Sequence, residues 1–189
     1  MGGPKALVRL AGETFAAAAL RVFARADVAA RIVVIGALAE RVAAEAGIPS
    51  DVTVAVNTRY AEGMLTSVQA GLDAAEALAA EAILIHPVDN PLVSAETVGA
   101  VLAALEAGAR IAVPSHGGRR GHPAGFARAA WQALRSAPAD AGARSVLAAH
   151  PDWVVHVAAG PDCLVDLDTP EALSAARRAL EAKDGSPRS

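Results

Sequence analysis

The sequence predicts an α/β fold with three layers, in which helices cover both faces of a mostly parallel sheet. Short β-branched segments alternate with longer alanine-rich amphipathic segments along the chain. This alternation indicates βαβ units, because parallel strands need a crossover connection that is usually helical. The composition agrees, since 53% of the 189 residues are hydrophobic and only 3% are aromatic, which favours a core of Ala, Val, Leu and Ile.

Each predicted strand is a short apolar run with few charges. In chain order the predicted strands are 31–36, 52–56, 82–87, 110–114 and 153–158. The predicted helices lie around them at about 14–26, 37–47, 66–80, 94–107, 126–136 and 170–183. Two helices carry start signals: Ser94 as an N-cap, and Thr169 as an N-cap followed by Pro170 at the first helical position.

The order of these elements predicts that the sheet lacks its first strand. A doubly wound sheet generally begins with a strand that leads into the ligand-binding loop, whereas here the first predicted strand follows the first predicted helix. The length fits one domain, which we expect over 1–180. The composition of 181–189 predicts a disordered tail.

Charge and cysteine content argue against several classes of function. The net charge of −3 and the scattered 17 Lys and Arg residues disfavour nucleic acid as a partner, because nucleic-acid binding needs a clustered basic face. The single cysteine, Cys163, excludes an internal disulfide and a zinc cluster of thiolates, and it fits the reducing cytoplasm. Charges interrupt each apolar run before it reaches the length of a spanning helix, so we expect no membrane partner.

Asp89 follows the predicted strand 82–87 in the stretch HPVDNPLVSAET. Ligands of such sheets bind beyond the carboxyl ends of the strands, and a carboxylate there can hold Mg²⁺ against nucleotide phosphates. The alternative is that Asp89 only stabilises a turn with Asn90 and Pro91.

A second acidic stretch, DCLVDLDTPEAL, contains Asp166 and Asp168 two positions apart. In an extended segment these side chains share a face, and either can supply the second carboxylate of a divalent-ion site. The alternative is a strand end followed by a helix cap.

The stretch SHGGRRGHPAGF has the composition of a ligand-binding loop, with glycines beside Arg119, Arg120 and His122. Guanidinium groups bind phosphate oxygens in pairs, and glycines allow close approach of the backbone to a ligand. The alternative is a solvated surface loop.

The stretch NTRYAEGMLTSVQAGL joins a predicted strand to a predicted helix through small polar residues. Such residues at a helix start can meet a base or ribose. Alternatively, Thr66 or Ser67 is an N-cap.

In this order the motifs resemble those of the molybdenum cofactor cytidylyltransferases, within the MobA-like nucleotidyltransferases. MGGPKALVRLAGETF resembles the end of the opening LAAGxSxRMGxxK motif and the helix after it. The other matches are YAEGMLTSVQAGL with EGMxxSLxxGL, HPVDNPLVSAETV with the DxPL metal site, GGRRGHPAGF with the GRRGHP loop and VDLDTPEAL with DIDTPEDL. The resemblance spans residues 1 to about 175, and its specificity comes from five motifs in the right order.

The resemblance implies a Rossmann-like nucleotidyltransferase fold and transfer of a cytidylyl group from CTP to the terminal phosphate of a molybdopterin-type cofactor, with release of pyrophosphate. It implies Lys5 and Asp89 as catalytic residues, and Mg²⁺ bound by Asp89 with Asp168 or Asp166. The residues that it implies for nucleotide binding are Gly2, Gly3, Lys5, Glu62, Gly63, Thr66 and Ser67. Those that it implies for the pterin acceptor are Arg119, Arg120, Gly121, His122 and Pro123. A molybdoenzyme or its chaperone is the implied recipient of the product.

The chain departs from the family pattern at its beginning. The family's first strand, its Ala-Ala-Gly turn and the arginine before Met1 are absent, and with them most backbone donors expected around the triphosphate. Loss of a central strand would cost free energy comparable with the whole stability of a domain, roughly 5–15 kcal/mol. We therefore expect the native reading frame to start upstream, which an intact mass beginning at Met1 in the native host would contradict.

Other functions remain open at this stage. Within the same fold they are a guanylyltransferase for the molybdenum cofactor and a cytidylyltransferase resembling those that act on methylerythritol phosphate. The absent loop motivates a third possibility, a nucleotide-binding or cofactor-binding module without activity. A purely structural role would not explain why acidic residues and an arginine loop gather at one sheet edge.

Overall fold

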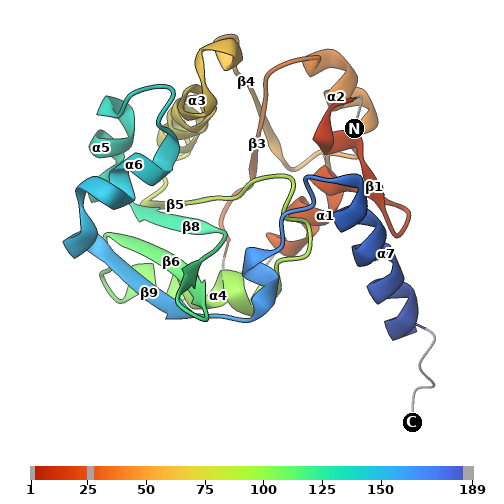
Figure 1. Ribbon diagram of the computed structural model, residues 1–189. Coiled ribbons are helices and arrows are strands. Elements are labelled where there is room, and N and C mark those ends of the chain that lie inside the picture. The colour runs from red at the N-terminus through yellow and green to blue at the C-terminus, as the bar shows by residue number, and fades with distance from the viewer. Residues whose placement is uncertain (1–2, 25–27, 185–189) are drawn as a thin grey trace.

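A computed structural model describes residues 3–24 and 28–184 of the chain (Figure 1). The strands are β1 (Arg9–Leu10), β2 (Glu13–Thr14), β3 (Ile32–Ile35), β4 (Thr53–Val56), β5 (Ala82–Ile85), β6 (Ile111–His116), β7 (Arg119–Arg120), β8 (Ala124–Ala127) and β9 (Val154–Ala158). The α-helices are α1 (Phe15–Val22), α2 (Ala39–Glu45), α3 (Met64–Ala77), α4 (Ala95–Glu106), α5 (Trp131–Ser136), α6 (Gly142–Ala149) and α7 (Pro170–Asp184). The 3-10 helices are η1 (Lys5–Leu7), η2 (Tyr60–Glu62), η3 (Arg128–Ala130), η4 (Pro151–Trp153) and η5 (Pro161–Leu164).

The strands and helices predicted from the sequence are present. The five predicted strands correspond to β3, β4, β5, β6 and β9, and each predicted helical segment contains a helix. The two start signals act as expected: the side chain of Ser94 accepts a hydrogen bond from the Thr97 amide, and that of Thr169 accepts one from the Ala172 amide. Helix α7 reaches Asp184, so 181–184 are helical, while the rest of the expected tail, 185–189, lies outside the described residues.

The central sheet is mixed rather than mostly parallel. Strand β8 lies between β5 and β6 and is antiparallel to both, whereas β9 is parallel to β6. The sequence predicts a helix from residue 126, and the helix α5 begins only at Trp131. Phe126 is fully buried in the core, and such burial between two strands overrides the helical preference of its alanine-rich neighbours.

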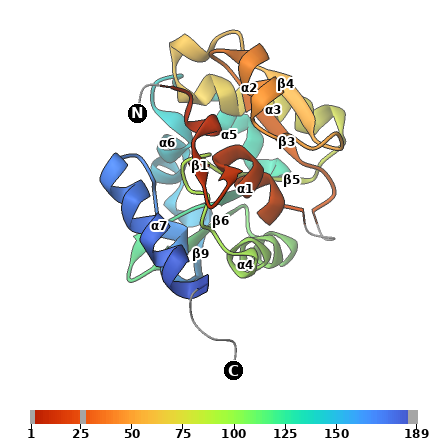
Figure 2. The same cartoon turned by 90° about the vertical axis from the view of Figure 1, so that its right-hand side faces the viewer.

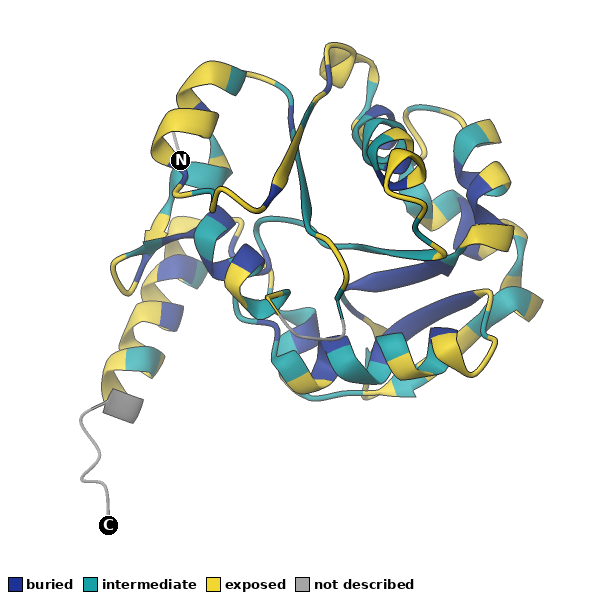
Figure 3. Ribbon diagram, turned by 180° about the vertical axis from the view of Figure 1, so that it is seen from behind, coloured by how far each residue is buried: buried dark blue, intermediate teal, exposed yellow. Residues whose placement is uncertain are grey.

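Helices cover both faces of the strands β5, β8, β6 and β9. On β6, Ile111 and Val113 point to the cluster that includes residues of α3, α5 and α6, while Ala112 packs with Val101 and Leu105 of α4. This alternation gives the three layers that the sequence predicts. Strands β6 and β8 are mostly buried, as Figure 3 shows, whereas β4 is mostly exposed.

Strands β3 and β4 form a separate parallel pair. Among the described residues, β3 pairs only with β4 and β5 pairs only with β8, so the strands are divided into two groups between β3 and β5. Helix α3 contacts strands of both groups and so connects them. The absence of a first strand stays a prediction.

The N-terminal segment packs beside the last helix. Phe15 and Leu10 share an apolar cluster with Leu167 and Leu173, so α1 and β1 lie against α7 (Figure 2). Alanine and leucine side chains of η1 contact a second cluster with Ile35 of β3. These contacts place Lys5 near the end of β3 and near the segment before α7. No helix in the described ranges is long and apolar enough to cross a membrane.

We predict that Phe126→Ala lowers the free energy of unfolding by about 3–5 kcal/mol, because it leaves a cavity between the sheet and its helices. Urea unfolding of both proteins measures this difference. Val155→Ala on β9 is the control, since Val155 is 44% exposed, and it should change stability by less than about 0.5 kcal/mol. Equal effects of the two substitutions would contradict this account of the core.

Candidate active site

Three charged side chains from distant parts of the chain meet at one point. The Nζ atom of Lys5 donates hydrogen bonds to Asp89 Oδ2 at 2.8 Å and to Asp168 Oδ1 at 2.5 Å. Lys5 begins η1, Asp89 lies in the turn between β5 and α4, and Asp168 lies just before α7. The structure therefore brings together a lysine and two acidic residues that the sequence singles out.

The backbone holds the two acidic segments together. The Leu167 amide donates a 2.7 Å hydrogen bond to the carbonyl oxygen of Asp89. Farther along the same segments, the Asp162 carboxylate accepts hydrogen bonds from the Ser94 amide at 2.8 Å and the Thr97 hydroxyl at 3.1 Å. Because Asp168 directly follows Leu167, the bond from the Leu167 amide holds Asp168 beside Asp89.

The electrostatics of the cluster favour the charged forms of Lys5 and Asp168. Hydrogen bonds to Asp168 and then to Asp89 raise the pKa of the Lys5 ammonium group. The hydrogen bond from Lys5, followed by contact with Asp89, lowers the pKa of the Asp168 carboxyl group. The side chains of Lys5, Asp89 and Asp168 are 42%, 20% and 53% exposed. Ion pairs with this degree of exposure add little to stability.

The two carboxylates form a donor set suited to a divalent cation. Both already receive one cationic group, the Lys5 ammonium, and Mg²⁺ prefers one or two carboxylates together with phosphate oxygens. Within residues 3–24 and 28–184, no three His, Cys, Asp or Glu side chains are grouped as a metal site. Asp166 is exposed, and Asp168 rather than Asp166 contacts Lys5.

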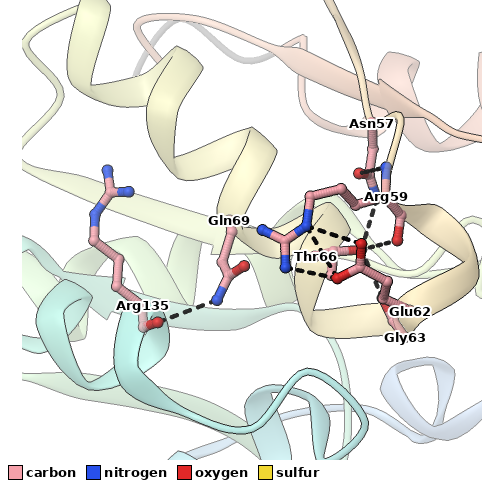
Figure 4. A network of polar contacts seen from close by, with 7 residues as sticks. All are labelled: Asn57, Arg59, Glu62, Gly63, Thr66, Gln69 and Arg135. Carbon is pink, nitrogen blue, oxygen red and sulfur yellow. Dashed lines mark hydrogen bonds and ion pairs between the residues drawn. The ribbon is translucent and has the colours of Figure 1, made fainter.

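The loop before α3 is organised by Asn57, which the sequence analysis does not single out (Figure 4). The Asn57 amide donates 2.9 Å hydrogen bonds to the hydroxyl oxygens of both Thr66 and Ser67. Thr66 is buried, and its hydroxyl also lies within hydrogen-bonding distance of the carbonyl oxygens of Arg59 and Gly63. The hydroxyls of Thr66 and Ser67 therefore shape the loop, and neither is the N-cap of α3, which is Gly63.

Glycine is required at position 63 for two reasons. Its φ of 137° lies in a region that side chains rarely adopt, and an added Cβ would lie 2.4 Å from the Ala139 carbonyl oxygen. The same carbonyl accepts a 3.2 Å hydrogen bond from the Leu65 amide, so the loop between α5 and α6 holds the start of α3. Glu62 is exposed and forms an ion pair with Arg59, which lowers the pKa of its carboxyl group.

The arginine loop has an exposed part and a buried part. Arg119 and Arg120 form β7 and are exposed, whereas Gly121 and Pro123 are buried. An added Cβ at Gly121 would lie 2.3 Å from the Cys163 carbonyl oxygen, which accepts a 2.9 Å hydrogen bond from the amide of His122.

Burial lowers the pKa of the His122 imidazole, although the charges of Asp166 and Asp89 oppose this shift. The loop is thus fixed near the acidic cluster, and its two guanidinium groups face solvent. Of the remaining predicted residues, Gly3 is exposed with open space around it, and Gly2 lies outside the described residues.

The geometry of this site agrees with a match to a known family. The chain matches the MobA-like NTP transferase domain over residues 1–154. It belongs to this family. As a MobA-like NTP transferase, the protein is a nucleotidyltransferase. No curated protein matches the chain.

Solved structures share the fold of this MobA-like protein at low sequence identity. Rv0371c from Mycobacterium tuberculosis H37Rv in complex with manganese is 23% identical, with 94% of this chain and 93% of that chain covered and a TM-score of 0.72. The 2-C-methyl-D-erythritol 4-phosphate cytidylyltransferase of Thermus thermophilus is 22% identical, with 95% of each chain covered and a TM-score of 0.68. Molybdopterin-guanine dinucleotide biosynthesis protein A of Archaeoglobus fulgidus is 16% identical, with 96% and 92% covered and a TM-score of 0.63.

The hydrogen bonds between the Asp162 carboxylate and the start of α4 predict a pH-dependent contribution to stability. Burial opposes ionisation, but hydrogen bonds from Ser94 and Thr97 outweigh it and lower the pKa of the Asp162 carboxyl group. The carboxylate therefore stabilises the fold in full above about pH 4, the ordinary range of Asp, and this contribution is lost as the pH falls through the lower folded-state value.

Asp162→Ala should lower the free energy of unfolding by roughly 1–3 kcal/mol at pH 7, and the difference should shrink in acid. Urea unfolding at a series of pH values measures it, with the exposed Asp152→Ala as control. A difference that stays constant down to low pH would be evidence against a lowered pKa.

Proposed function

We propose that this nucleotidyltransferase transfers a cytidylyl group from CTP to the terminal phosphate of a molybdopterin-type cofactor and releases pyrophosphate. The observation that carries the proposal is the contact of Lys5 with both Asp89 and Asp168. These residues lie 84 and 163 positions after Lys5 in the chain. An oxygen of the acceptor phosphate would attack the α-phosphorus of CTP, and the bond to the β-phosphate oxygen would break. Such a reaction depends on alignment and neutralisation of charge more than on covalent help from the protein.

Lys5 would act on the reacting phosphates. Its raised pKa keeps the ammonium charged at neutral pH, so it can stabilise negative charge on the α-phosphate and on the departing pyrophosphate. Its partial exposure allows the ammonium to exchange a carboxylate for a phosphate oxygen. Gly2 and Gly3, which precede Pro4 and Lys5 in the sequence, would contribute backbone amides to the same phosphates.

Asp89 and Asp168 would hold Mg²⁺. When bound, this ion supplies charge neutralisation and orientation for the triphosphate and the acceptor phosphate. Two observations support this role. Both carboxylates contact the same cationic group, and a hydrogen bond joins their backbone segments. Asp166 is disfavoured, because it does not reach Lys5.

The two remaining loops would bind the two ends of the substrate pair. Backbone groups from Glu62 to Ser67 would meet the base and ribose, since the hydroxyls of Thr66 and Ser67 already bond to Asn57. The exposed guanidinium groups of Arg119 and Arg120 would bind the phosphate of the pterin acceptor, with Gly121, His122 and Pro123 as the fixed base of that loop. Delivery of the product to a molybdoenzyme or its chaperone, in the cytoplasm, would complete this role.

Three alternatives remain, and the first two follow from structural neighbours. The names of two structural neighbours favour a methylerythritol phosphate cytidylyltransferase or a molybdopterin guanylyltransferase. The GRRGHP and EGMLTS motifs favour the molybdenum cofactor as acceptor. A binding module without turnover is the third candidate.

Release of pyrophosphate tests these functions directly. The 189-residue protein is incubated with Mg²⁺, with CTP or GTP, and with either molybdopterin or methylerythritol phosphate. We expect pyrophosphate from CTP with molybdopterin only. A clear preference for GTP would overturn the choice of base, and binding of CTP without turnover in any mixture would support the binding module instead.

Asp89→Asn and Asp168→Asn should each lower the rate of pyrophosphate release by about 10²-fold or more, because each removes one of two proposed ligands of the metal. Asp166→Asn is the matched comparison, and it should leave the rate nearly unchanged. Steady-state assays over a range of Mg²⁺ concentrations measure the effect. A loss at Asp166 equal to that at Asp168 would show that the metal site is assigned to the wrong residue.

A further inference from the structure

Asn90 is a buried polar residue that the proposed reaction does not yet use. Its side chain is completely buried, its Nδ2 atom donates a 3.3 Å hydrogen bond to the Cys163 carbonyl oxygen, and its Oδ1 atom has no hydrogen-bond partner. A buried amide with an unpaired oxygen is unfavourable, and an apolar side chain of similar shape would avoid that cost. Packing alone therefore does not explain an asparagine at this position. The favourable interaction of its side chain is the hydrogen bond to the Cys163 carbonyl oxygen.

The Cys163 carbonyl connects two loops of the candidate site. It accepts the hydrogen bond from Asn90 and a second one, at 2.9 Å, from the His122 amide. The backbone carbonyl of Asn90 in turn accepts a 2.9 Å hydrogen bond from His86 Nε2 at the end of β5. Asn90 thus lies between the strand that leads to Asp89 and the segment that leads to Asp168.

Two of the contacts between these segments lie next to the carboxylates of the candidate site. Residues 89 and 90 on one segment bond to residues 167 and 163 on the other, through the carbonyl of Asp89 and the side chain of Asn90. The bonds from Ser94 and Thr97 to Asp162 also join the segments, but they lie farther from Asp89. The Asn90 bond is therefore the second contact beside the carboxylates, and it limits rotation of the Asp89 turn about the bond from Leu167. Since Asp168 follows Leu167, this orientation decides whether both carboxylates face the same cation.

We propose that Asn90 is a positioning residue, whose amide holds the Asp89 turn against Cys163 so that Asp89 and Asp168 can bind one divalent cation. The inference rests on the proposed function for the identity of the cation. It goes beyond that function because Asn90 acts through its bond to Cys163 and is not among the residues proposed to bind the metal or the substrates.

Asn90→Leu tests the proposal, with Asn90→Ala as a second variant in case the larger side chain disturbs folding. Thr97→Val is the matched control, because Thr97 is also buried and donates a hydrogen bond between the same two segments, but farther from Asp89. Urea unfolding measures the stability of each variant.

The first measurement is amide hydrogen exchange at Leu167, followed by NMR in the full 189-residue protein. We expect exchange about tenfold faster or more in the Asn90 variants than in Thr97→Val at matched global stability, because the bond from Leu167 to Asp89 opens locally. Unchanged protection of Leu167 in both Asn90 variants would overturn the proposal, whatever the activity.

The second measurement is the dissociation constant of Mn²⁺, determined from the electron paramagnetic resonance signal of the free ion. We expect affinity about 10–100-fold weaker in the Asn90 variants and unchanged in Thr97→Val. Equal affinity in the Asn90 variants and the parent would also overturn the proposal. If the parent and Asp89→Asn bound Mn²⁺ alike, the proposed metal site would fail instead, and the exchange at Leu167 would still decide the role of Asn90.

Discussion

The hydrogen bond from the Leu167 amide to the Asp89 carbonyl is the contact on which the candidate site depends. It joins the turn after β5 to the segment before α7, and it sets the carboxylates of Asp89 and Asp168 around the ammonium group of Lys5. Leu167 is buried against Phe15 of α1, so the apolar packing of α7 and α1 supports the same bond. This backbone contact thus links the core to the charged cluster at the surface.

The fold supplies this geometry at one edge of its central strands. Asp89 follows β5 and Gly63 follows β4, as expected where the carboxyl ends of strands meet. The antiparallel strand β8 completes the buried centre of the sheet and does not disturb that edge. The two strand groups, divided between β3 and β5, are connected by α3 and by the contacts of η1, which carries Lys5.

Much of this architecture could be predicted from the sequence, because apolar runs and capping residues report local preference directly. Strand β8 could not, since its alanine-rich sequence takes the extended form only through burial between two strands. The order of motifs pointed to Lys5, Asp89 and Asp168, but it left Asp166 and Asp168 equivalent. The structure distinguishes them by the contact of Asp168 with Lys5, and the choice of metal ligand stays a prediction.

Other residues of the site are harder to predict from the sequence. Cys163 and Leu167 hold the site through backbone hydrogen bonds. Almost any residue could form such bonds, so the side-chain types at these positions do not indicate this role. Asn57 does stand directly after β4, at the edge where ligands bind, and this position could have indicated its role in holding Thr66 and Ser67. The Thr66 hydroxyl is buried and shapes this loop, and nucleotide binding by Thr66 stays a prediction.

The central proposal is that the carboxylates of Asp89 and Asp168 bind the same divalent cation beside Lys5. A crystal structure of the protein with Mn²⁺ and CTP, with anomalous scattering used to locate the metal, tests it most directly. The account predicts one manganese peak within coordination distance of both carboxylates and of the triphosphate. A metal ion bound by only one of these carboxylates, or bound elsewhere on the protein, would contradict it.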